Sequence, residues 1–238
     1  FEHRLATFIR SYQFIGREKL VITAGTRILI GASYIMLTFG NRKYMTNVFD
    51  KIIVSTEDKE IKELALSENI EVDDRPLNMS GDIVTKVQVV DEYLRRTNAI
   101  ETHTTITALL PTCPFRNVAD IRQPFRIFME NKHKIPFLIG VSEYDFPIQL
   151  ALVEEENNSM KMLDTDGYLT TRSQDIEKRF HPNGSIYMAS IKDFLEKGTF
   201  FNETMLTYVM PPERSYDIDY PYQFQIAEAI AIANNINP

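Results

Sequence analysis

The chain has 238 residues, of which 44% are hydrophobic and 25% charged, a composition typical of a globular protein that buries a sizeable core. Its net charge of −7 argues against a broad nucleic-acid surface, which needs a basic stripe, but not against a nucleotide substrate, which needs only a few cations. The single cysteine, Cys113, excludes an intrachain disulfide, and no apolar run is long enough to span a bilayer. We therefore expect a cytoplasmic protein without nucleic-acid or membrane partners.

Short apolar runs alternate with helical patterns along the chain, and this alternation is typical of βαβ units. We expect strands at Leu5–Ile9, Lys51–Val54, Ile70–Val72, Thr105–Leu110, Phe137–Val141 and Ile186–Met188. Helices are expected at Ile28–Thr38, after Ser55, from about Ile83, from Ile121 to Phe128, and from Phe224 to Ile230. The sequence therefore predicts an α/β fold, a three-layer sandwich with a mostly parallel, Rossmann-like sheet, organised as one domain over residues 1–238.

Two of the expected helices have recognisable starts or faces. The tetrapeptide from Ser55 to Asp58 fits the Ser-x-x-acid pattern of a helix start. The buried stripe of that helix is then expected to comprise Ile61, Leu64 and Ala65. The next helix is expected to bury one face made of Ile83, Val87, Val90 and Leu94.

A polar and partly acidic stretch runs from about residue 142 to residue 182. A loop of that length is unusual inside a compact domain, so we interpret the stretch as an excursion from the sheet. It is followed by Asn183-Gly184, a strong signal for a hairpin or another tight turn.

Three groups of residues carry candidate chemistry. Asp217 and Asp219 flank Ile218, and in an extended chain residues i and i+2 share a face, so the two carboxylates suit Mg²⁺ with substrate phosphates. An Asp-x-Asp is also compatible with an ordinary solvated edge. The rigid turn from Pro111 to Arg116 follows a buried strand, where ligands bind in open α/β sheets, or where a loop simply packs. Arg75 suits a phosphate, or a surface ion pair with a neighbouring aspartate.

Other chemistries find little support in the sequence. The four histidines lack zinc-ligand spacing, and no Gly-x-Ser-x-Gly, Walker A or Gly-x-Gly-x-x-Gly sequence is present. We interpret Cys113 as a small packing residue, because nothing near it in the sequence would lower the pKa of its thiol.

The order of several short segments is more specific than any one of them. These segments are Val54–Asp58, Arg75–Pro76 with Ser80–Asp82, Leu110–Arg116, Arg172–Asp175, Pro182–Tyr187, Phe200–Phe201 and Glu213–Asp219. In this order and spacing the chain, from about Phe49 to its end, resembles the acylneuraminate cytidylyltransferase (CMP-sialic acid synthetase) family.

The resemblance implies an enzyme of the nucleotide-diphospho-sugar transferase fold type that joins CMP from CTP to a nine-carbon keto-sugar acid and releases pyrophosphate. It implies Mg²⁺ on Asp217 and Asp219, which would act in catalysis together with Arg10 and Lys19. The nucleotide would lie near Arg10, Arg17, Lys19, Arg75, Ser80 and Asp82. The sugar pocket would be formed by Arg172, Gln174, Asn183, Tyr187, Phe200 and Phe201. The family also implies a homodimer formed through the excursion at about 142–182.

The chain departs from the family at its N-terminal nucleotide-binding loop. Where a Gly-Gly-Ser-Lys type sequence is usual, the chain has Ser11–Phe14, so only the flanking Arg10 and Lys19, with Arg17, can be matched. The loss matters because glycines allow backbone N–H groups to approach a triphosphate closely. Two later departures are Leu110 in place of a glutamine and Gln223 in place of an acid. These changes imply weak CTP binding, a different nucleotide, or no activity.

Three alternatives to this cytidylyltransferase remain open at the level of sequence. The first is a related nucleotidyltransferase that uses another sugar acid or nucleotide. The second is a non-catalytic nucleotide- or sugar-binding protein on the same scaffold. The third, a pure interaction module, is the least favoured, because Asp217 and Asp219 stand at the expected metal position.

Overall fold

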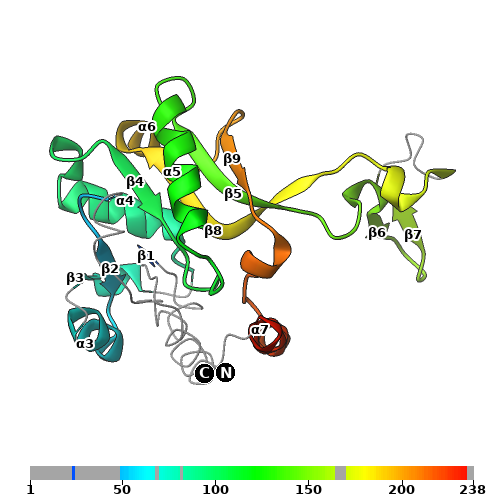
Figure 1. Ribbon diagram of the computed structural model, residues 1–238, viewed down its shortest axis with the longest axis horizontal. Helices are drawn as coiled ribbons and strands as arrows, with labels where there is room; N and C mark the ends of the chain where they lie inside the picture. Colours follow the sequence, from blue (N-terminus) through cyan, green and yellow to red (C-terminus); the bar gives the residue numbers. More distant parts are fainter. Residues whose placement is uncertain (1–22, 25–48, 68–69, 81–82, 164–169, 235–238) are drawn as a thin grey trace.

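The computed structural model describes residues 23–24, 49–67, 70–80, 83–163 and 170–234 (Figure 1). The expected strand Leu5–Ile9 and the expected helix Ile28–Thr38 lie outside the described residues, as does the side chain of Leu64.

The first sheet is parallel and has the strand order β1-β2-β3. Its strands are β1 (Thr23–Ala24), β2 (Ile53–Thr56) and β3 (Glu71–Asp74). Helix α3 (Lys59–Ser67) connects β2 to β3, and its residues Ile61 and Ala65 are buried as expected. This is the βαβ unit that the alternation of apolar runs predicted.

The second sheet is mixed and has the order β4-β8-β5-β9. Its strands are β4 (Thr105–Ala108), β8 (Phe180–Ser190), β5 (Phe137–Glu143) and β9 (Leu206–Val209). Strands β5 and β9 are parallel, whereas β8 runs antiparallel to both of its neighbours. The parallel arrangement therefore holds for the first sheet and for the β5–β9 pair, with β8 as the exception.

Helices cover both faces of the second sheet and create the three layers. On one face, α4 (Lys86–Arg96) and α6 (Ile191–Lys197) pack on one set of strand residues, and on the other α5 (Ala119–Asn131) packs on the alternate set. In β5, Phe137, Ile139 and Val141 belong to the first cluster and Leu138 to the second, because successive strand side chains point to opposite faces. The α/β class and the three-layer arrangement are confirmed.

The remaining elements are short or peripheral. Helix α7 (Pro221–Ala233) closes the described chain and buries Phe224, Ala227 and Ala231. The 3-10 turns are η2 (Leu77–Met79), η3 (Ala99–Glu101), η4 (Ile148–Leu150), η6 (Ser173–Asp175) and η7 (Pro212–Arg214).

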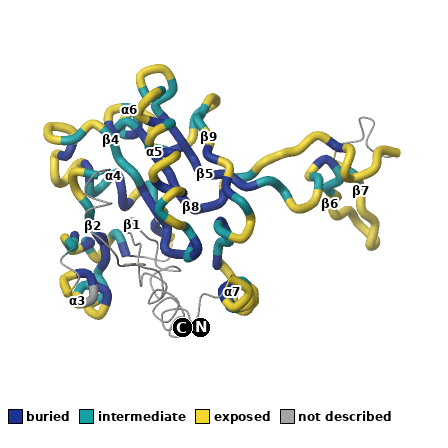
Figure 2. The backbone as a smooth tube through the Cα atoms, in the orientation of Figure 1, coloured by how far each residue is buried: buried dark blue, intermediate teal, exposed yellow. Residues whose placement is uncertain are grey.

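Between β5 and β8 the chain leaves the body of the molecule, and we call residues 144–179 the arm. The arm contains an antiparallel pair, β6 (Leu152–Glu154) and β7 (Met160–Met162), that forms a sheet of its own. Strands β5 and β8 stay paired up to Glu143 and Phe180, so two connected strands support the arm where it leaves the body. Figure 1 shows the arm projecting away from the helices, and Figure 2 shows that it is mostly exposed.

The structure differs from the sequence-based expectations at three local positions. The helix expected from about Ile83 begins at Lys86, because Thr85 caps it by accepting a hydrogen bond from the backbone of Gln88, and Ile83 is 92% exposed. Asp58, not Ser55, receives the Ile61 N–H at the start of α3, at 3.0 Å.

The third difference is at Asn183-Gly184, where the chain does not form the expected hairpin or tight turn. Both residues lie inside β8, at a register shift opposite Ile139 to Val141 of β5. Gly184 has φ +71°, so the glycine serves a bulge in the strand and not a chain reversal.

Burial in the second sheet should dominate the stability of the fold. Replacing Leu138, which lies near the start of β5 and has no exposed surface, by alanine should lower the free energy of unfolding by about 2–5 kcal/mol. The matched control is Leu66→Ala on α3, where the leucine is 60% exposed and the loss should stay below about 0.5 kcal/mol. Urea titrations of both variants measure the two losses, and equal losses would contradict the assigned core.

Candidate active site

The two predicted metal-binding carboxylates lie on the irregular segment that follows η7. The backbone N–H of Ile218 donates to the carbonyl oxygen of Thr112 at 3.0 Å, and the Ile218 side chain is buried. Because Asp217 and Asp219 flank this buried residue, both carboxylates fall on the opposite face of the segment. Desolvation and the charge of Asp217 raise the pKa of Asp219, so the two carboxylates lie close enough to interact.

An ion pair between a buried aspartate and a partly exposed arginine fixes the turn that precedes these carboxylates. Asp120 of α5 is fully buried and accepts hydrogen bonds from Arg214 of η7 at 2.9 and 3.1 Å. It also accepts a hydrogen bond from the hydroxyl of Tyr208 in β9 at 3.1 Å. One carboxylate thus ties α5, β9 and η7 together, and this arrangement positions the segment that carries Asp217.

The bulge in β8 makes room for the first carboxylate. A β-carbon built on Gly184 would overlap Oδ2 of Asp217, and the positive φ of Gly184 is itself unfavourable for other residues. Opposite the bulge, a β-carbon on Gly140 of β5 would lie 2.8 Å from Oδ1 of Asn183. Two glycines therefore allow β8 to bend so that its backbone faces Asp217 directly.

The turn after β4 packs against the same bulge. The thiol of Cys113 donates to the carbonyl oxygen of Asn183 at 3.2 Å. Arg116 donates to the carbonyl oxygens of Leu110 at 2.8 Å and Ser185 at 2.9 Å, and burial lowers the pKa of its guanidinium. Arg116 therefore joins β8 to the turn, and the turn lies at the carboxyl end of β4 as predicted.

The single cysteine behaves as a packing residue, as expected. Cys113 has no exposed surface, and burial together with the neighbouring Asp217 raises the pKa of its thiol. Within the described part of the chain, the hydroxyls of Thr112 and Ser185 are buried and have no hydrogen-bond partner. The charge of Asp217 acts on the Cys113 thiol, so Asp217 lies close to this turn.

Lys86 belongs to this site and was not predicted. It is the first residue of α4, and its ammonium lies 4.1 Å from the centroid of the Tyr187 ring. Burial lowers its pKa, while the negative charges of Asp217 and Asp219 oppose that shift. One signal in the sequence could have indicated it, since a cation in the first turn of a helix opposes the helix dipole.

The predicted sugar-binding aromatics form a group, but only one of them offers much surface. Tyr187 lies 5.6 Å from Phe200 and 6.1 Å from Phe201, measured between ring centroids. Phe200 has no exposed surface and packs at 4.6 Å on Phe194, so in this structure it is a core residue that supports Tyr187. Phe201, which is 38% exposed, remains as the accessible aromatic.

Asn183, also predicted to bind sugar, is buried, and its side chain forms hydrogen bonds to β5 and within β8. Its amide nitrogen donates to Ser142 at 3.1 Å, and its side-chain oxygen accepts the Ser185 N–H at 3.1 Å. These bonds shape the bulge, so the structure gives Asn183 a local structural role.

Arg172 and Gln174 lie on the arm, away from the carboxylates in the body. Both are exposed, and Arg172 pairs with Asp175 at 2.7 Å. Figure 1 shows the arm well separated from the end of the body where α7 begins. Within one chain, therefore, these two residues do not join Tyr187 and Asp217.

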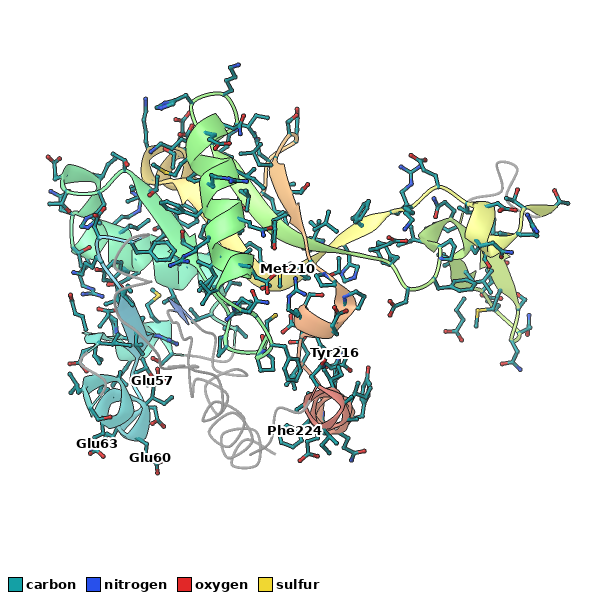
Figure 3. The ribbon with its side chains drawn as sticks, viewed as in Figure 1. Glu57, Glu60, Glu63, Met210, Tyr216 and Phe224 are labelled. Atoms are coloured by element: carbon teal, nitrogen blue, oxygen red, sulfur yellow. The ribbon has the colours of Figure 1, made fainter. Side chains whose placement is uncertain are left out.

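Arg75 lies at the carboxyl ends of β2 and β3, as predicted, but its side chain is buried and binds other protein groups. It hydrogen-bonds Ser55 and lies 3.7 Å from the carboxylate of Glu57. Figure 3 places Glu57 and Tyr216, the residue before Asp217, on opposite sides of the lower part of the molecule. Ser80 is buried, and its hydroxyl donates to the carbonyl oxygen of Pro76 at 3.2 Å.

The other predicted nucleotide-binding residues cannot be placed. Arg10, Arg17, Lys19 and Asp82 lie outside the described residues. In the described ranges, no group of three or more histidine, cysteine, aspartate or glutamate side chains could hold a metal. No helix within those ranges has both the length and the apolar character needed to cross a membrane.

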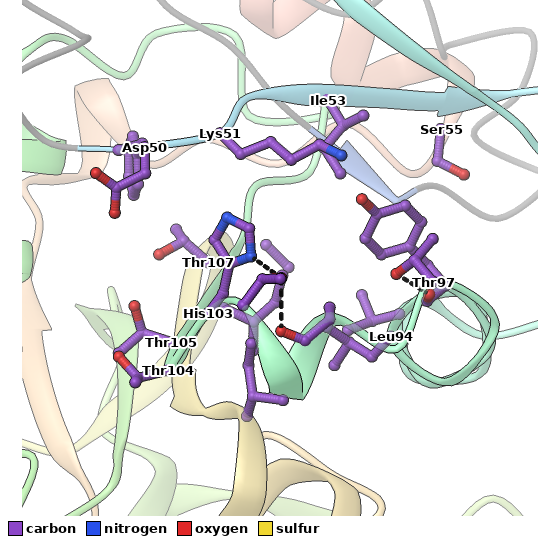
Figure 4. Close-up of a pocket in the computed structure, with 18 of the residues that line it drawn as sticks. Asp50, Lys51, Ile53, Ser55, Leu94, Thr97, His103, Thr104, Thr105 and Thr107 are labelled. Carbon is purple, nitrogen blue, oxygen red and sulfur yellow. Dashed lines mark hydrogen bonds between the residues drawn. The ribbon is translucent and has the colours of Figure 1, made fainter.

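A cavity of about 320 Å³ lies elsewhere, between β2, α4 and β4 (Figure 4). Its lining includes Lys51, Tyr93, His103 and a series of threonines, and His103 lies 2.7 Å from the Thr102 hydroxyl. None of the predicted site residues that the structure describes lines this cavity. It is therefore separate from the carboxylate site.

Comparison with known proteins supports the resemblance found in the sequence. Over 194 residues the chain is 31% identical to the pseudaminic acid cytidylyltransferase of Campylobacter jejuni subsp. jejuni serotype O:2, covering 80% of this chain and 82% of the relative. It is 27% identical over 191 residues to the N-acylneuraminate cytidylyltransferase of Escherichia coli O18:K1:H7, covering 80% of this chain and 44% of that longer protein.

A solved structure supports the fold. The structure of CMP:2-keto-3-deoxy-manno-octonic acid synthetase complexed with CTP matches with a TM-score of 0.51 at 11% identity, over 92% of each chain. No protein-family model matches the chain. The identity to the Campylobacter jejuni protein over four-fifths of both sequences decides the assignment: the chain belongs to the family of sialic-acid-type cytidylyltransferases.

Proposed function

We propose that this chain transfers CMP from CTP to a nine-carbon keto-sugar acid and releases pyrophosphate. The observation that carries the proposal is the placement of Asp217 and Asp219 on one face of a segment anchored to Thr112, in a member of the cytidylyltransferase family. In this reaction the anomeric hydroxyl oxygen of the sugar bonds to the α-phosphorus of CTP. The bond from that phosphorus to the bridging oxygen breaks, pyrophosphate leaves with the electron pair, and the hydroxyl loses its proton.

The two carboxylates fit a magnesium ion. Mg²⁺ commonly uses one or two protein carboxylates and completes its coordination with phosphate oxygens and water. Asp217 and Asp219 supply hard oxygen ligands. Burial, and then the charge of Asp217, raise the pKa of Asp219, and a cation would relieve the repulsion between the two carboxylates. When bound, the ion would neutralise charge on the phosphate oxygens.

The protein groups around the carboxylates would mainly orient the reactants. Gly184 and the turn at Thr112 hold Asp217 in place, and positioning of this kind is the largest protein contribution to phosphoryl transfer. We propose that Arg10 and Lys19 add positive charge at the phosphates, and that Arg75 acts indirectly by holding the ends of β2 and β3. Use of CTP is also consistent with a cytoplasmic location.

We further propose that the chain acts as a homodimer through the arm. The arm exposes apolar side chains that a solvated loop would not need, namely Phe146, Leu152, Val153, Met160 and Leu163. Arg172 and Gln174 lie on the arm, which projects away from the body that carries Asp217 and Asp219, so a second chain is the natural place for them to act. The arm would then complete the sugar pocket of the partner.

The acidic pair should matter more for turnover than for folding. Asp217→Asn or Asp219→Asn should reduce pyrophosphate release in the presence of CTP, Mg²⁺ and the sugar acid by about two orders of magnitude or more. The melting temperature should change little, because asparagine keeps the size of the side chain and removes a repulsion between two like charges. Unchanged pyrophosphate release in the double variant would remove these residues from the mechanism.

Gly184→Ala should reduce turnover, because the new β-carbon would displace the Asp217 carboxylate in addition to straining the backbone. A matched control is Gly198→Ala, since Gly198 has a similar φ of +66° but nothing within 4 Å of a built β-carbon. Both variants should lose about 1 kcal/mol or more of stability through the positive φ. Only Gly184→Ala should also lose turnover at a temperature where it remains folded, and equal turnover in the two variants would contradict the proposed contact.

The apolar surface of the arm should control the oligomeric state. Light scattering at micromolar concentration should give twice the chain mass of 27.6 kDa for the wild type. The double variant Leu152→Asp/Met160→Asp should be monomeric, because charge in an apolar interface is costly. Leu66→Asp, at an equally exposed leucine outside the arm, should remain dimeric. A monomeric wild type would exclude the arm as a stable interface.

A further inference from the structure

We propose that Lys86 is a substrate-binding residue whose ammonium receives the carboxylate of the sugar acid. The inference rests on the proposed function, since it takes a keto-sugar acid as the substrate. It starts from the place of Lys86 in the fold: Tyr187 lies on one side of its ammonium, and the Asp217 and Asp219 charges are near enough to act on it. Lys86 thus stands between the predicted sugar side and the predicted metal side of the site.

The environment of Lys86 is unfavourable for a lysine that has only a structural role. Among the described residues its ammonium makes no hydrogen bond and no ion pair within 4 Å, although the side chain is half-buried. The position at the first residue of α4 adds repulsion from the positive end of the helix dipole. A partly desolvated cation under these conditions gains most from an incoming anion.

The covalent structure of the substrate identifies that anion. In a 2-keto-sugar acid the carboxylate and the reacting hydroxyl are attached to the same carbon, so the carboxylate must accompany the attacking oxygen to the α-phosphate. The phosphates are expected at the metal-binding face of Asp217 and Asp219. The carboxylate must therefore lie beside that face and next to the sugar, which is where the Lys86 ammonium is located.

The aromatic neighbours keep the ammonium in this position. The Tyr187 ring beneath it is held by Phe200, which is fully buried. A cation over an aromatic face is stabilised and restricted in its movement, so Lys86 is ordered before the substrate arrives. Exposed Phe201, 6.1 Å from Tyr187, offers an apolar surface for the sugar ring on the same side.

Steady-state kinetics with one substrate varied at a time test the assignment. Lys86→Met keeps the length of the side chain but removes the charge, so it should raise the KM for the sugar acid by about 10- to 100-fold, the usual worth of a charge-assisted hydrogen bond. The KM for CTP should stay unchanged. Lys86→Arg should restore most of the affinity, and Lys192→Met, which removes an exposed cation on α6, should behave as the wild type.

Other outcomes would overturn the assignment. A rise in the KM for CTP alone would assign the ammonium to a phosphate, and unchanged values of both KM would exclude contact with either substrate. Calorimetric binding of the sugar acid to wild type and Lys86→Met, without CTP, gives a readout that does not require turnover. If the wild type binds the sugar acid through Lys86 but releases no pyrophosphate, the proposed function fails, whereas the assignment of Lys86 to the carboxylate of the sugar acid stands. Matching melting temperatures of the variants would exclude a folding defect.

Discussion

The arrangement of the site depends on the close approach of the Asp217 carboxylate to the backbone of β8 at Gly184. Two carboxylates near each other repel, and a segment carrying them would relax away from the sheet without a rigid support. Here the support is the hydrogen bond from the Ile218 N–H to the Thr112 carbonyl oxygen on one side and the bulge in β8 on the other. The side-chain bonds of Asn183 and the glycine at position 140 shape that bulge.

The acidic pair could be proposed from the sequence because Asp217 and Asp219 flank a single apolar residue, Ile218, which the structure buries. The bulge could not, since Asn183-Gly184 has the same local preference for positive φ in a hairpin as in a bulged strand. The choice between them is made by β5, which pairs with β8 both before Gly184 (Phe180 to Pro182) and after it (Tyr187 to Ala189) and so keeps β8 a single strand. Lys86 was missed for a similar reason: its importance comes from Tyr187, which is a hundred residues away in the chain.

The arginines show a second limit of sequence reasoning. Arg75 and Arg116 both lie at carboxyl ends of strands, where a guanidinium suggests a phosphate ligand. In the structure Arg116 bonds the carbonyl oxygens of Leu110 and Ser185, and Arg75 bonds Ser55 near Glu57. A guanidinium has five donors in a fixed plane, so it can bind the carbonyl oxygens of an irregular loop as readily as the oxygens of a phosphate. Only the positions of the surrounding carbonyl oxygens distinguish the two roles, and these are set by the tertiary fold.

Because Cys113 is buried, the rate at which its thiol is alkylated reports how often the turn after β4 separates from β8. The thiol has no exposed surface, donates to the carbonyl oxygen of Asn183, and has a raised pKa, so alkylating reagents should find little reactive thiolate in the closed site. Modification requires the turn after β4 to separate from the bulge. When reclosing is fast compared with labelling, the rate of labelling measures the free energy of that local separation. Because the chain has no other cysteine, the signal arises from this one position, at the centre of the site.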